Sequence, residues 1–267
     1  MTYDTVTLEF EGPVAIVKLN RPEVLNSMTD ALSRDARAAL AEVRSRTGVR
    51  ALIFTSAGRA FCAGAELNED LLNGDGTRSA GAVLNETMLS QTNPWIKDLH
   101  EFPVPVVTAV NGVAAGAGVG LALAADITIA ARSASFILSF CPKLGLIPDV
   151  GTTWHLPRRI GRARATALAL LGNKLGAEQA AEWGLIWKCV DDDQLASTAM
   201  NLAMTLAATP PHITSELRAA LKQAETNTLD EQLDYERERQ CVLVETAAFR
   251  EGVNAFREKR IPKFCQE

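Results

Sequence analysis

The first half of the chain alternates short apolar runs with segments of helical spacing. Two stretches of alternating apolar and polar positions, Thr5–Phe10 and Val14–Leu19, flank the turn Glu11-Gly12-Pro13 and predict a β-hairpin. Apolar residues then recur at helical spacing from Thr29, a good N-cap, to Arg46. Continuous apolar runs predict buried strands at Ala51–Thr55, Val104–Val110 and Ile127–Ala131, and a helix is expected at Val119–Ala125. This alternation of strand and helix predicts an α/β fold.

The second half of the chain is dominated by helical spacing. Helices are predicted at 163–171, 177–183, 195–208, 213–221, 229–245 and 246–259, with a short strand at 186–190. Residues 68–79 are rich in glycine and asparagine and are expected to form an irregular, mobile flap, followed by a helical segment up to His100. The sequence has no internal repeat and no low-complexity linker. We therefore expect one continuous core, with a sheet-rich region over residues 1–195 and a helical C-terminal region over residues 196–267.

Composition and charge exclude several classes of function. The formal charge of −5 and the pI of about 5.4 come from acidic and basic residues mixed along the chain, so we expect no basic face that binds nucleic acid. The longest apolar stretch, at 113–125, is too short to span a membrane, and the N-terminus lacks a signal segment, so a soluble cytoplasmic protein is expected. Five cysteines without a Cys-x-x-Cys pair and three widely spaced histidines predict neither disulfides nor a metal site.

Two turns of small residues, each following a predicted strand, are the first candidates for a functional site. They are Phe61–Leu67 and Asn111–Gly118. Small side chains let a ligand approach the backbone, and unpaired N–H groups at a helix start bind negative charge, so the two turns predict a two-donor oxyanion hole. Tight packing of strand against helix is the alternative interpretation. A dinucleotide-binding loop is excluded, because after Gly116 and Gly118 the third glycine position holds Leu121 and no acid lies near residue 138.

Asp149 is the most distinctive acidic residue of the chain. It follows the apolar run Leu144–Pro148 and precedes the small-residue turn Val150–Thr153. A carboxyl group that enters an apolar pocket has its pKa raised toward the range of a general base. An aspartate before Gly-Thr-Thr is also a common helix N-cap, so the residues alone leave both interpretations open.

Four motifs occur in the order typical of the crotonase (enoyl-CoA hydratase/isomerase) superfamily, which the chain resembles over essentially its whole length. Leu19–Met28 is similar to the family's first CoA-contacting loop, Ala60–Ala65 and Asn111–Gly118 to its two oxyanion segments, and Phe256–Arg260 to its C-terminal helix. The resemblance implies a β/α spiral core that binds acyl-CoA in a bent pose. It also implies a helical C-terminal region that supports a homotrimer or hexamer and forms part of the CoA site. It implies no cofactor beyond the CoA of the substrate.

The resemblance further implies roles for individual residues. The backbone N–H groups of Ala65 and Ala117 are expected to bind the thioester oxygen, which becomes negative when a neighbouring proton is removed. Additional contacts with substrate or CoA are expected from Val24, Ala63, Gly64, Leu67, Gly116, Gly118 and Lys259.

The two acidic residues used by hydratases of this family are both absent. Their positions fall on Gly120 and on about Phe140, in a segment that looks one residue longer than usual because of Pro142. Addition of water needs an acid and a base aimed at the same water, so hydratase activity is not expected. Asp149 lies where some isomerases of the family carry their base, and one carboxylate is enough to move a proton between two carbons. Thr152 stands where a second glycine is usual in the family.

Four further segments are similar to one isomerase branch of the family, which converts a ring 1,2-epoxide of phenylacetyl-CoA into the seven-membered oxepin. These segments are Lys143–Asp149, Ala167–Asn173, Glu182–Trp187 and Ala224–Leu229. Conversion of 1,2-epoxyphenylacetyl-CoA to oxepin-CoA is therefore the expected activity. Isomerisation of linear Δ3-enoyl-CoA to Δ2-enoyl-CoA is an alternative that uses the same residues. A catalytically silent acyl-CoA-binding protein is a further alternative, against which Asp149 argues. No pocket role is assigned to Met88, Trp95, Phe140 or Trp154, because such residues more often fill a core.

Overall fold

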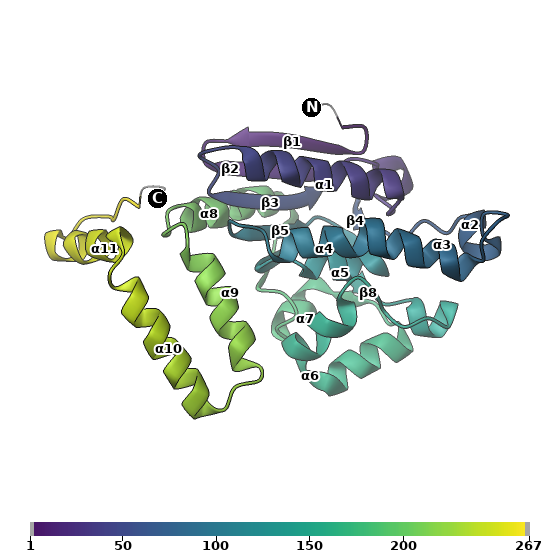
Figure 1. Ribbon diagram of the computed structural model, residues 1–267. Coiled ribbons are helices and arrows are strands. Elements are labelled where there is room, and N and C mark those ends of the chain that lie inside the picture. Colours follow the sequence, from purple (N-terminus) through teal and green to yellow (C-terminus); the bar gives the residue numbers. More distant parts are fainter. Residues whose placement is uncertain (1–2, 265–267) are drawn as a thin grey trace.

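The computed structural model describes residues 3–264, in which helices surround two β-sheets (Figure 1). The α/β class predicted from the sequence is confirmed. The last three residues of the predicted region 196–267, Cys265 among them, lie outside the described part of the chain.

The larger sheet contains six strands in the order β1-β2-β3-β5-β7-β10. The predicted hairpin forms β1 (Val6–Glu11) and β2 (Val14–Leu19), which pair antiparallel. The other strands extend the sheet in parallel and are β3 (Ala51–Ser56), β5 (Val106–Val110), β7 (Ile127–Ala131) and β10 (Lys188–Val190). Every residue of β5 is buried, which is why this central strand is an unbroken apolar run.

The sequence did not predict the smaller sheet, whose four strands have the order β4-β6-β8-β9. They are β4 (Ala60–Cys62), β6 (Val113–Ala115), β8 (Ser135–Ile137) and β9 (Leu175–Gly176). Strands of two or three residues carry no readable alternation, so β4 and β6 were interpreted as parts of the small-residue turns. Because β4 and β6 pair in parallel, the two predicted oxyanion turns lie side by side at one edge of the core.

Two helices, α1 and α8, pack on the larger sheet. α1 (Asp30–Ser45) packs on β1 and β2 and begins at the predicted N-cap Thr29, whose hydroxyl accepts a hydrogen bond from the Leu32 N–H at 3.1 Å. α8 (Leu195–Ala207) packs on β3 and β5, so the first helix of the predicted C-terminal region is part of the core. The other elements around the core are α5 (Ala117–Leu123), α6 (Thr152–Leu171), α7 (Ala177–Glu182), η1 (Pro22–Val24) and η4 (Asp192–Gln194).

α6 starts eleven residues earlier than the sequence predicted, at Thr152 instead of Ala163. Pro157 lies inside the helix, and Gly161 has the non-helical angles φ 74° and ψ 162°, which mark a kink. Proline and glycine are the residues that normally end a helix, so they hid its first half from the sequence pattern.

The segment predicted to be an irregular flap is partly helical. It contains α2 (Glu69–Asn73), and α3 (Ala80–Thr87), the π-helix η2 (Met88–Thr92) and α4 (Asn93–His100) follow it. π-Helices are rare and frequently occur at functional sites. A second π-helix, η3 (Phe140–Leu144), contains Pro142. A π-turn closes over one more residue than an α-turn, so it accommodates the residue that appeared to be inserted.

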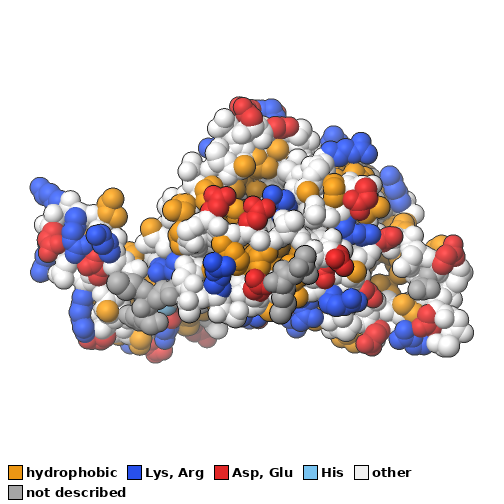
Figure 2. Space-filling model, turned by 90° about the horizontal axis from the view of Figure 1, so that it is seen from above, with side chains coloured by type: hydrophobic (Ala, Val, Ile, Leu, Met, Phe, Trp, Pro, Cys, Tyr) orange, Lys and Arg blue, Asp and Glu red, His pale blue; other side chains and the backbone are white. Residues whose placement is uncertain are grey.

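The last three helices form an arm that extends away from the two sheets (Figure 1). They are α9 (Ile213–Ala224), α10 (Leu229–Leu243) and α11 (Ala247–Glu258). Seen from above, the arm projects beyond the body of the molecule, and acidic and basic side chains are interspersed over this face (Figure 2). Within residues 3–264, no helix combines the length and the apolar character that crossing a membrane requires.

Candidate active site

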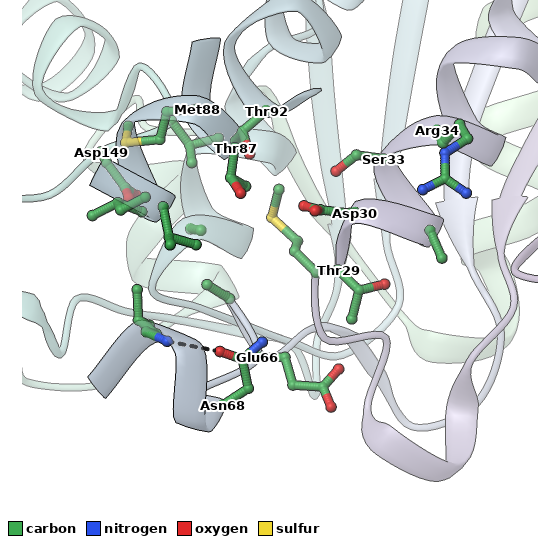
Figure 3. Close-up of a pocket in the computed structure, with 18 residues that line it drawn as sticks. Thr29, Asp30, Ser33, Arg34, Glu66, Asn68, Thr87, Met88, Thr92 and Asp149 are labelled. Carbon is green, nitrogen blue, oxygen red and sulfur yellow. Dashed lines mark hydrogen bonds between the residues drawn. The ribbon is translucent and has the colours of Figure 1, made fainter. Parts of the chain in front are cut away.

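One cavity of about 470 Å³ brings together Ala65, Ala117 and Asp149, the three residues predicted to carry the chemistry (Figure 3). It lies between the start of α1, the segment after β4, the helices α3 and η2, and the turns that precede α5 and α6. Its lining residues are Met28, Thr29, Asp30, Ala31, Ser33, Arg34, Ala65, Glu66, Asn68, Leu71, Val83, Leu84, Thr87, Met88, Thr92, Ala117, Asp149 and Val150.

The Ala65 N–H group is left free by the contact that holds its segment in place. Met28 and Ala65 form an isolated parallel bridge, in which the Met28 N–H donates to the Gly64 carbonyl at 2.8 Å and the Glu66 N–H donates to the Met28 carbonyl at 2.9 Å. The residue between two such bonds directs its own N–H to the opposite side of the pair. In the described part of the chain this N–H has no acceptor, so it is available to a ligand.

Ala117 supplies a second free N–H group. It is the first residue of α5, after Gly116 (φ 52°), and no side chain caps this helix. The first N–H groups of a helix have no intrahelical acceptor, and the Ala117 N–H donates to no other group within residues 3–264. The two turns touch, because a Cβ atom on Gly64 would lie 3.5 Å from the Ala117 nitrogen and 2.9 Å from the Ala115 oxygen. Only glycine at position 64 allows the two donors to approach this closely.

Asp149 lies on a tight turn that leads into α6. Val150 (φ 53°) and Gly151 (φ 73°) are both left-handed, and the Thr152 N–H donates to the Asp149 carbonyl at 2.8 Å. A left-handed conformation is costly for a β-branched residue such as Val150, so the turn holds backbone strain next to the candidate base. The N-cap of α6 is Gly151, so the interpretation of Asp149 as an N-cap is wrong.

The carboxylate of Asp149 is partly buried and has no hydrogen-bond partner in any other described residue, its one hydrogen bond being to its own backbone. Its Oδ1 atom is buried and makes no hydrogen bond to any described residue. Burial disfavours the charged form and raises the pKa of Asp149 to about 6. A carboxyl group with a pKa near neutrality can both accept and return a proton at physiological pH. A carboxylate held in this way destabilises the fold, which makes Asp149 a candidate for chemistry and not for stability.

Packing fills the two positions where the hydratase acids are missing. A Cβ atom on Gly120 would overlap the Val150 carbonyl oxygen and would lie 2.7 Å from the Thr152 Oγ1 atom. The turn that carries Asp149 therefore occupies the space that a side chain at position 120 needs. Phe140 is buried at the start of η3, where its ring lies 3.7 Å from the position of a Cβ atom on Gly116.

The residues predicted to contact CoA lie outside the cavity lining. Val24, Ala63 and Leu67 are exposed. The Ala63 N–H donates to the Leu25 carbonyl at 3.0 Å, which places the loop after η1 beside the segment that contains Ala65. These residues thus lie on the surface near the segment that contains Ala65, and their contact with CoA stays a prediction.

The other residues predicted to contact substrate or CoA are three glycines of the two turns and Lys259 on the arm. Gly118 packs against the backbone of β4, since a Cβ atom there would overlap the Cys62 carbonyl and lie 2.9 Å from the Cys62 Cβ atom. Gly116 is the residue before α5, and Gly64 lies where the two turns touch, as described above. Lys259 ends α11 on the arm (φ 53°) and does not line the cavity of its own chain.

Asn26 is a structural residue of the site that the sequence analysis did not single out. It is 0% exposed and left-handed (φ 55°). Its side chain accepts a hydrogen bond from the Arg21 N–H at 2.8 Å and donates to the Ala57 and Ala60 carbonyls at 2.9 Å each. Asn26 therefore ties the predicted CoA loop to β4. Asparagine is common in loops, so the residue type alone gave no signal of this role.

Five polar side chains of the lining were also missed: Asp30, Ser33, Arg34, Thr87 and Thr92. Asp30 and Ser33 are three residues apart on α1, which places them on one face of that helix. Thr87 and Thr92 are five residues apart, and this spacing aligns side chains on a π-helix but not on an α-helix. The sequence pattern gave no sign of the π-helix, so the two threonines were not recognised as neighbours.

Of the apolar residues left unassigned, only Met88 lines the cavity. Trp95 is fully buried and packs edge-on against Phe54 with ring centres 6.2 Å apart. Trp154 is 40% exposed and packs against His155, outside the cavity.

The comparison with a protein-family model decides the family. The model described as enoyl-CoA hydratase/isomerase matches residues 9–267. The chain belongs to the enoyl-CoA hydratase/isomerase family. A 1,2-epoxyphenylacetyl-CoA isomerase from Escherichia coli (strain K12) is 51% identical over 254 residues, which cover 95% of each chain. A protein of Rhodobacter capsulatus described as an enoyl-CoA hydratase is 42% identical and covers 99% of each chain.

Solved structures of the family share the fold. An enoyl-CoA hydratase/isomerase from Mycobacterium abscessus has a TM-score of 0.89 at 34% identity and covers 98% of this chain and 100% of that chain. An enoyl-CoA hydratase from Bacillus anthracis has a TM-score of 0.88 at 31% identity, with coverages of 99% and 100%. The predicted crotonase-like fold and the predicted enzyme family are thereby confirmed.

Proposed function

We propose that this member of the family isomerises an acyl-CoA thioester by moving a proton between two carbons of the acyl group. The observation that carries the proposal is the unpaired Asp149 carboxylate in one cavity with the free N–H groups of Ala65 and Ala117. The reaction needs one base and one site that stabilises negative charge on the thioester oxygen. These groups supply both, and the reaction requires no separate cofactor.

Each group has a defined task in the proposed reaction. Asp149 takes a proton from the carbon next to the thioester carbonyl, and the electron pair moves onto the carbonyl oxygen. The N–H groups of Ala65 and Ala117 donate to that oxygen, and one such donor lowers the barrier by about 3 kcal/mol. Asp149 then returns the proton to another carbon of the conjugated system while the electrons flow back from the oxygen. The thioester is restored and the double bond has moved.

The substrate that we propose is 1,2-epoxyphenylacetyl-CoA, with oxepin-CoA as product. Two observations support this choice: the four segments that resemble the ring-epoxide branch, and the 51% identity to the isomerase of Escherichia coli. The methylene group between the thioester and the ring would carry the proton that Asp149 removes. The bond between the two epoxide carbons would break, its electron pair joining the ring π-system, so that both C–O bonds are kept in the seven-membered oxepin, and the proton would return to a ring carbon.

Isomerisation of linear Δ3-enoyl-CoA is the second candidate. Val83, Leu84 and Met88 give the cavity an apolar wall, and such a wall suits a hydrocarbon chain. A catalytically silent acyl-CoA-binding protein is the third. It would need no carboxylate in the cavity, so the presence of Asp149 in the lining counts against it.

Hydration is not proposed, although several relatives are described as hydratases. The cavity lining contains two other carboxylates, Asp30 and Glu66. Glu66 is paired with Arg21 at 3.4 Å, and Asp30 lies across the cavity from Asp149 (Figure 3). Gly120 stands where the resemblance places one hydratase acid, so that position gives Asp149 no second carboxylate with which to activate water.

Replacement of Asp149 by asparagine tests the proposed function. Asp149→Asn keeps the size of the side chain but removes the base, so turnover of both ring-epoxide phenylacetyl-CoA and 3-enoyl-CoA should fall at least about 100-fold. CoA binding should be nearly unchanged. Glu86→Gln is the matched control, because Glu86 is an exposed acid of α3 outside the cavity lining, and it should keep full turnover. Wild-type turnover of a folded Asp149→Asn variant on both substrates would refute the proposal.

We also propose that the protein assembles as a homotrimer or as a hexamer in the cytoplasm. The arm exposes apolar side chains that its own chain leaves uncovered. They include Leu217, Leu221, Leu229, Leu233, Phe249 and Phe256. Burial of these side chains between subunits would stabilise an assembly and would bring Lys259 near a neighbouring chain. Light scattering at micromolar concentration tests this, and an active monomer would contradict it.

A further inference from the structure

The π-helix η2 has a cause in the sequence, which is the proline that follows it. In an α-helix the Ser90 carbonyl accepts a hydrogen bond from residue 94, but Pro94 has no N–H group and its ring would clash with that carbonyl. The wider π-turn removes the clash. Its Asn93 N–H donates to the Met88 carbonyl, five residues earlier. Pro94 therefore explains why the helix widens here, and it leaves the Ser90 carbonyl without its α-helical donor.

Arg37 of α1 supplies a donor that Pro94 cannot. Its Nη1 atom donates to the Ser90 carbonyl at 3.1 Å, and its Nε atom donates to the carboxylate of Asp98 on α4 at 2.9 Å. Both side chains are half-buried. A planar guanidinium directs donors at two acceptors in a fixed geometry, which a lysine ammonium cannot do. Arg37 therefore ties the π-turn and the helix after it to α1.

This contact lies one helical turn beyond the cavity. Ser33 lines the cavity, and Arg37 follows it by four residues on the same face of α1, where the helix packs on η2 and α4. The end of α3 and η2 line the same cavity with Thr87, Met88 and Thr92 (Figure 3). A π-turn that lost its side-chain donor would expose an unsatisfied carbonyl, and the wall formed by these three residues would shift with it.

We propose that Arg37 is a positioning residue, which holds the π-turn and thereby fixes the cavity wall against which the acyl group binds. The proposal rests on the proposed function, which makes this cavity the acyl site. Arg37 is not part of the lining and acts through the Ser90 carbonyl. Loss of its guanidinium should leave the CoA part of a ligand bound as before and weaken only the contact between acyl group and wall.

Two unreactive thioesters test the proposal: phenylacetyl-CoA and acetyl-CoA. They share CoA and the thioester and differ by the phenyl group, which reaches the wall. Arg37→Met keeps the length of the side chain and removes the donors. In calorimetry it should lower the affinity for phenylacetyl-CoA about 10-fold, as expected for one hydrogen bond from a charged donor, and that for acetyl-CoA less than about 2-fold. A purely structural loss of folded protein would affect both ligands alike.

Arg44→Met is the matched control. Arg44 lies on the same helix and pairs with the same Asp98 carboxylate at 3.8 Å, but within the described residues it donates to no carbonyl of η2. The ratio of the two affinities should therefore stay at the wild-type value. An equal change of the ratio in Arg37→Met and Arg44→Met would assign the effect to the ion pairs with Asp98 and would overturn the proposal.

Replacement of Pro94 tests the link to the missing donor. Pro94→Ala restores an N–H group that can donate to the Ser90 carbonyl, so Arg37→Met should change the affinity ratio less in this background than in the wild type. An equal change in both backgrounds would contradict the proposal. If Arg37→Met does not fold, Arg37→Lys, which keeps the charge but not the fork of donors, should still lose about 3-fold of the ratio.

Asp149→Asn separates this test from that of the proposed function. It should lose turnover and keep both affinities, and full turnover in the folded variant would refute the isomerase mechanism alone. An affinity ratio that is unchanged in folded Arg37→Met would refute the role of Arg37 alone.

Discussion

Replacement of Asp149 by asparagine should make the protein more stable at neutral pH while it removes activity. Burial raises the pKa of Asp149 to about 6 from its usual value of 3.8. The folded protein therefore binds this proton more tightly than the unfolded chain does. The stability contributed by the protonated form is fully present below pH 3.8 and is lost as the pH rises through about 6. Above pH 7 the charged carboxylate remains as a net cost to folding.

The size of this cost follows from the two pKa values, which differ by about 2.2. One pKa unit corresponds to about 1.4 kcal/mol, so the penalty at pH 8 is about 3 kcal/mol. At pH 5 the unfolded chain is mostly ionised while the folded protein is mostly protonated, and the penalty is about 1.6 kcal/mol. The advantage of Asp149→Asn should thus grow by about 1.4 kcal/mol between pH 5 and pH 8.

Chemical denaturation of wild type and variant at both pH values measures this difference. Protein concentration must be the same throughout, because assembly also contributes to stability. The asparagine amide adds donors of its own, but their effect does not change over this pH range and cancels in the comparison. A stability difference that is the same at pH 5 and pH 8 would show that the carboxylate is not held unpaired, and the assignment of Asp149 as a tuned base would lose its physical support.

Three further results are expected. In the wild type, log(kcat/KM) should rise with pH, with a slope of about one below pH 6, and level off above it, because only ionised Asp149 accepts a proton. A profile that is flat from pH 5 to pH 8 would contradict this. Ala117→Pro should lower turnover at least about 100-fold, because it removes one oxyanion donor. The helix itself should be kept, since proline is compatible with the first position of α5. Ala117→Gly is the control, which keeps the N–H group and should retain most activity. Gly120→Ala should lower kcat, because the added Cβ atom would displace the Val150 carbonyl and with it Asp149. Gly252→Ala is the control and should change neither kcat nor stability by much, since a Cβ atom there meets nothing within 4 Å. Normal kcat in Gly120→Ala would show that the turn adapts.

Local sequence signals were enough to identify the elements that have strong periodicity. The hairpin, the Thr29 N-cap and the buried strand β5 each depend on contacts within a few residues or on continuous burial, which the sequence pattern records directly. The two small-residue turns and the acid after an apolar run marked candidate segments, and the resemblance to the family then assigned the expected roles to Ala65, Ala117 and Asp149.

Tertiary structure alone decided that these residues line one cavity. The short strands β4 and β6 are stabilised by pairing with each other. Neither segment alone predicts this contact or the approach of the two N–H donors that follows from it. Whether Asp149 caps a helix or stands unpaired depends on burial by distant segments, and that burial raises its pKa. The π-turn that aligns Thr87 with Thr92 changes the spacing on which every helical pattern relies. The sequence therefore determined the family and the candidate reactive groups. The approach of the two N–H donors, the burial of Asp149 and the alignment of Thr87 with Thr92 depend on contacts between segments or on backbone geometry, which only the folded chain possesses.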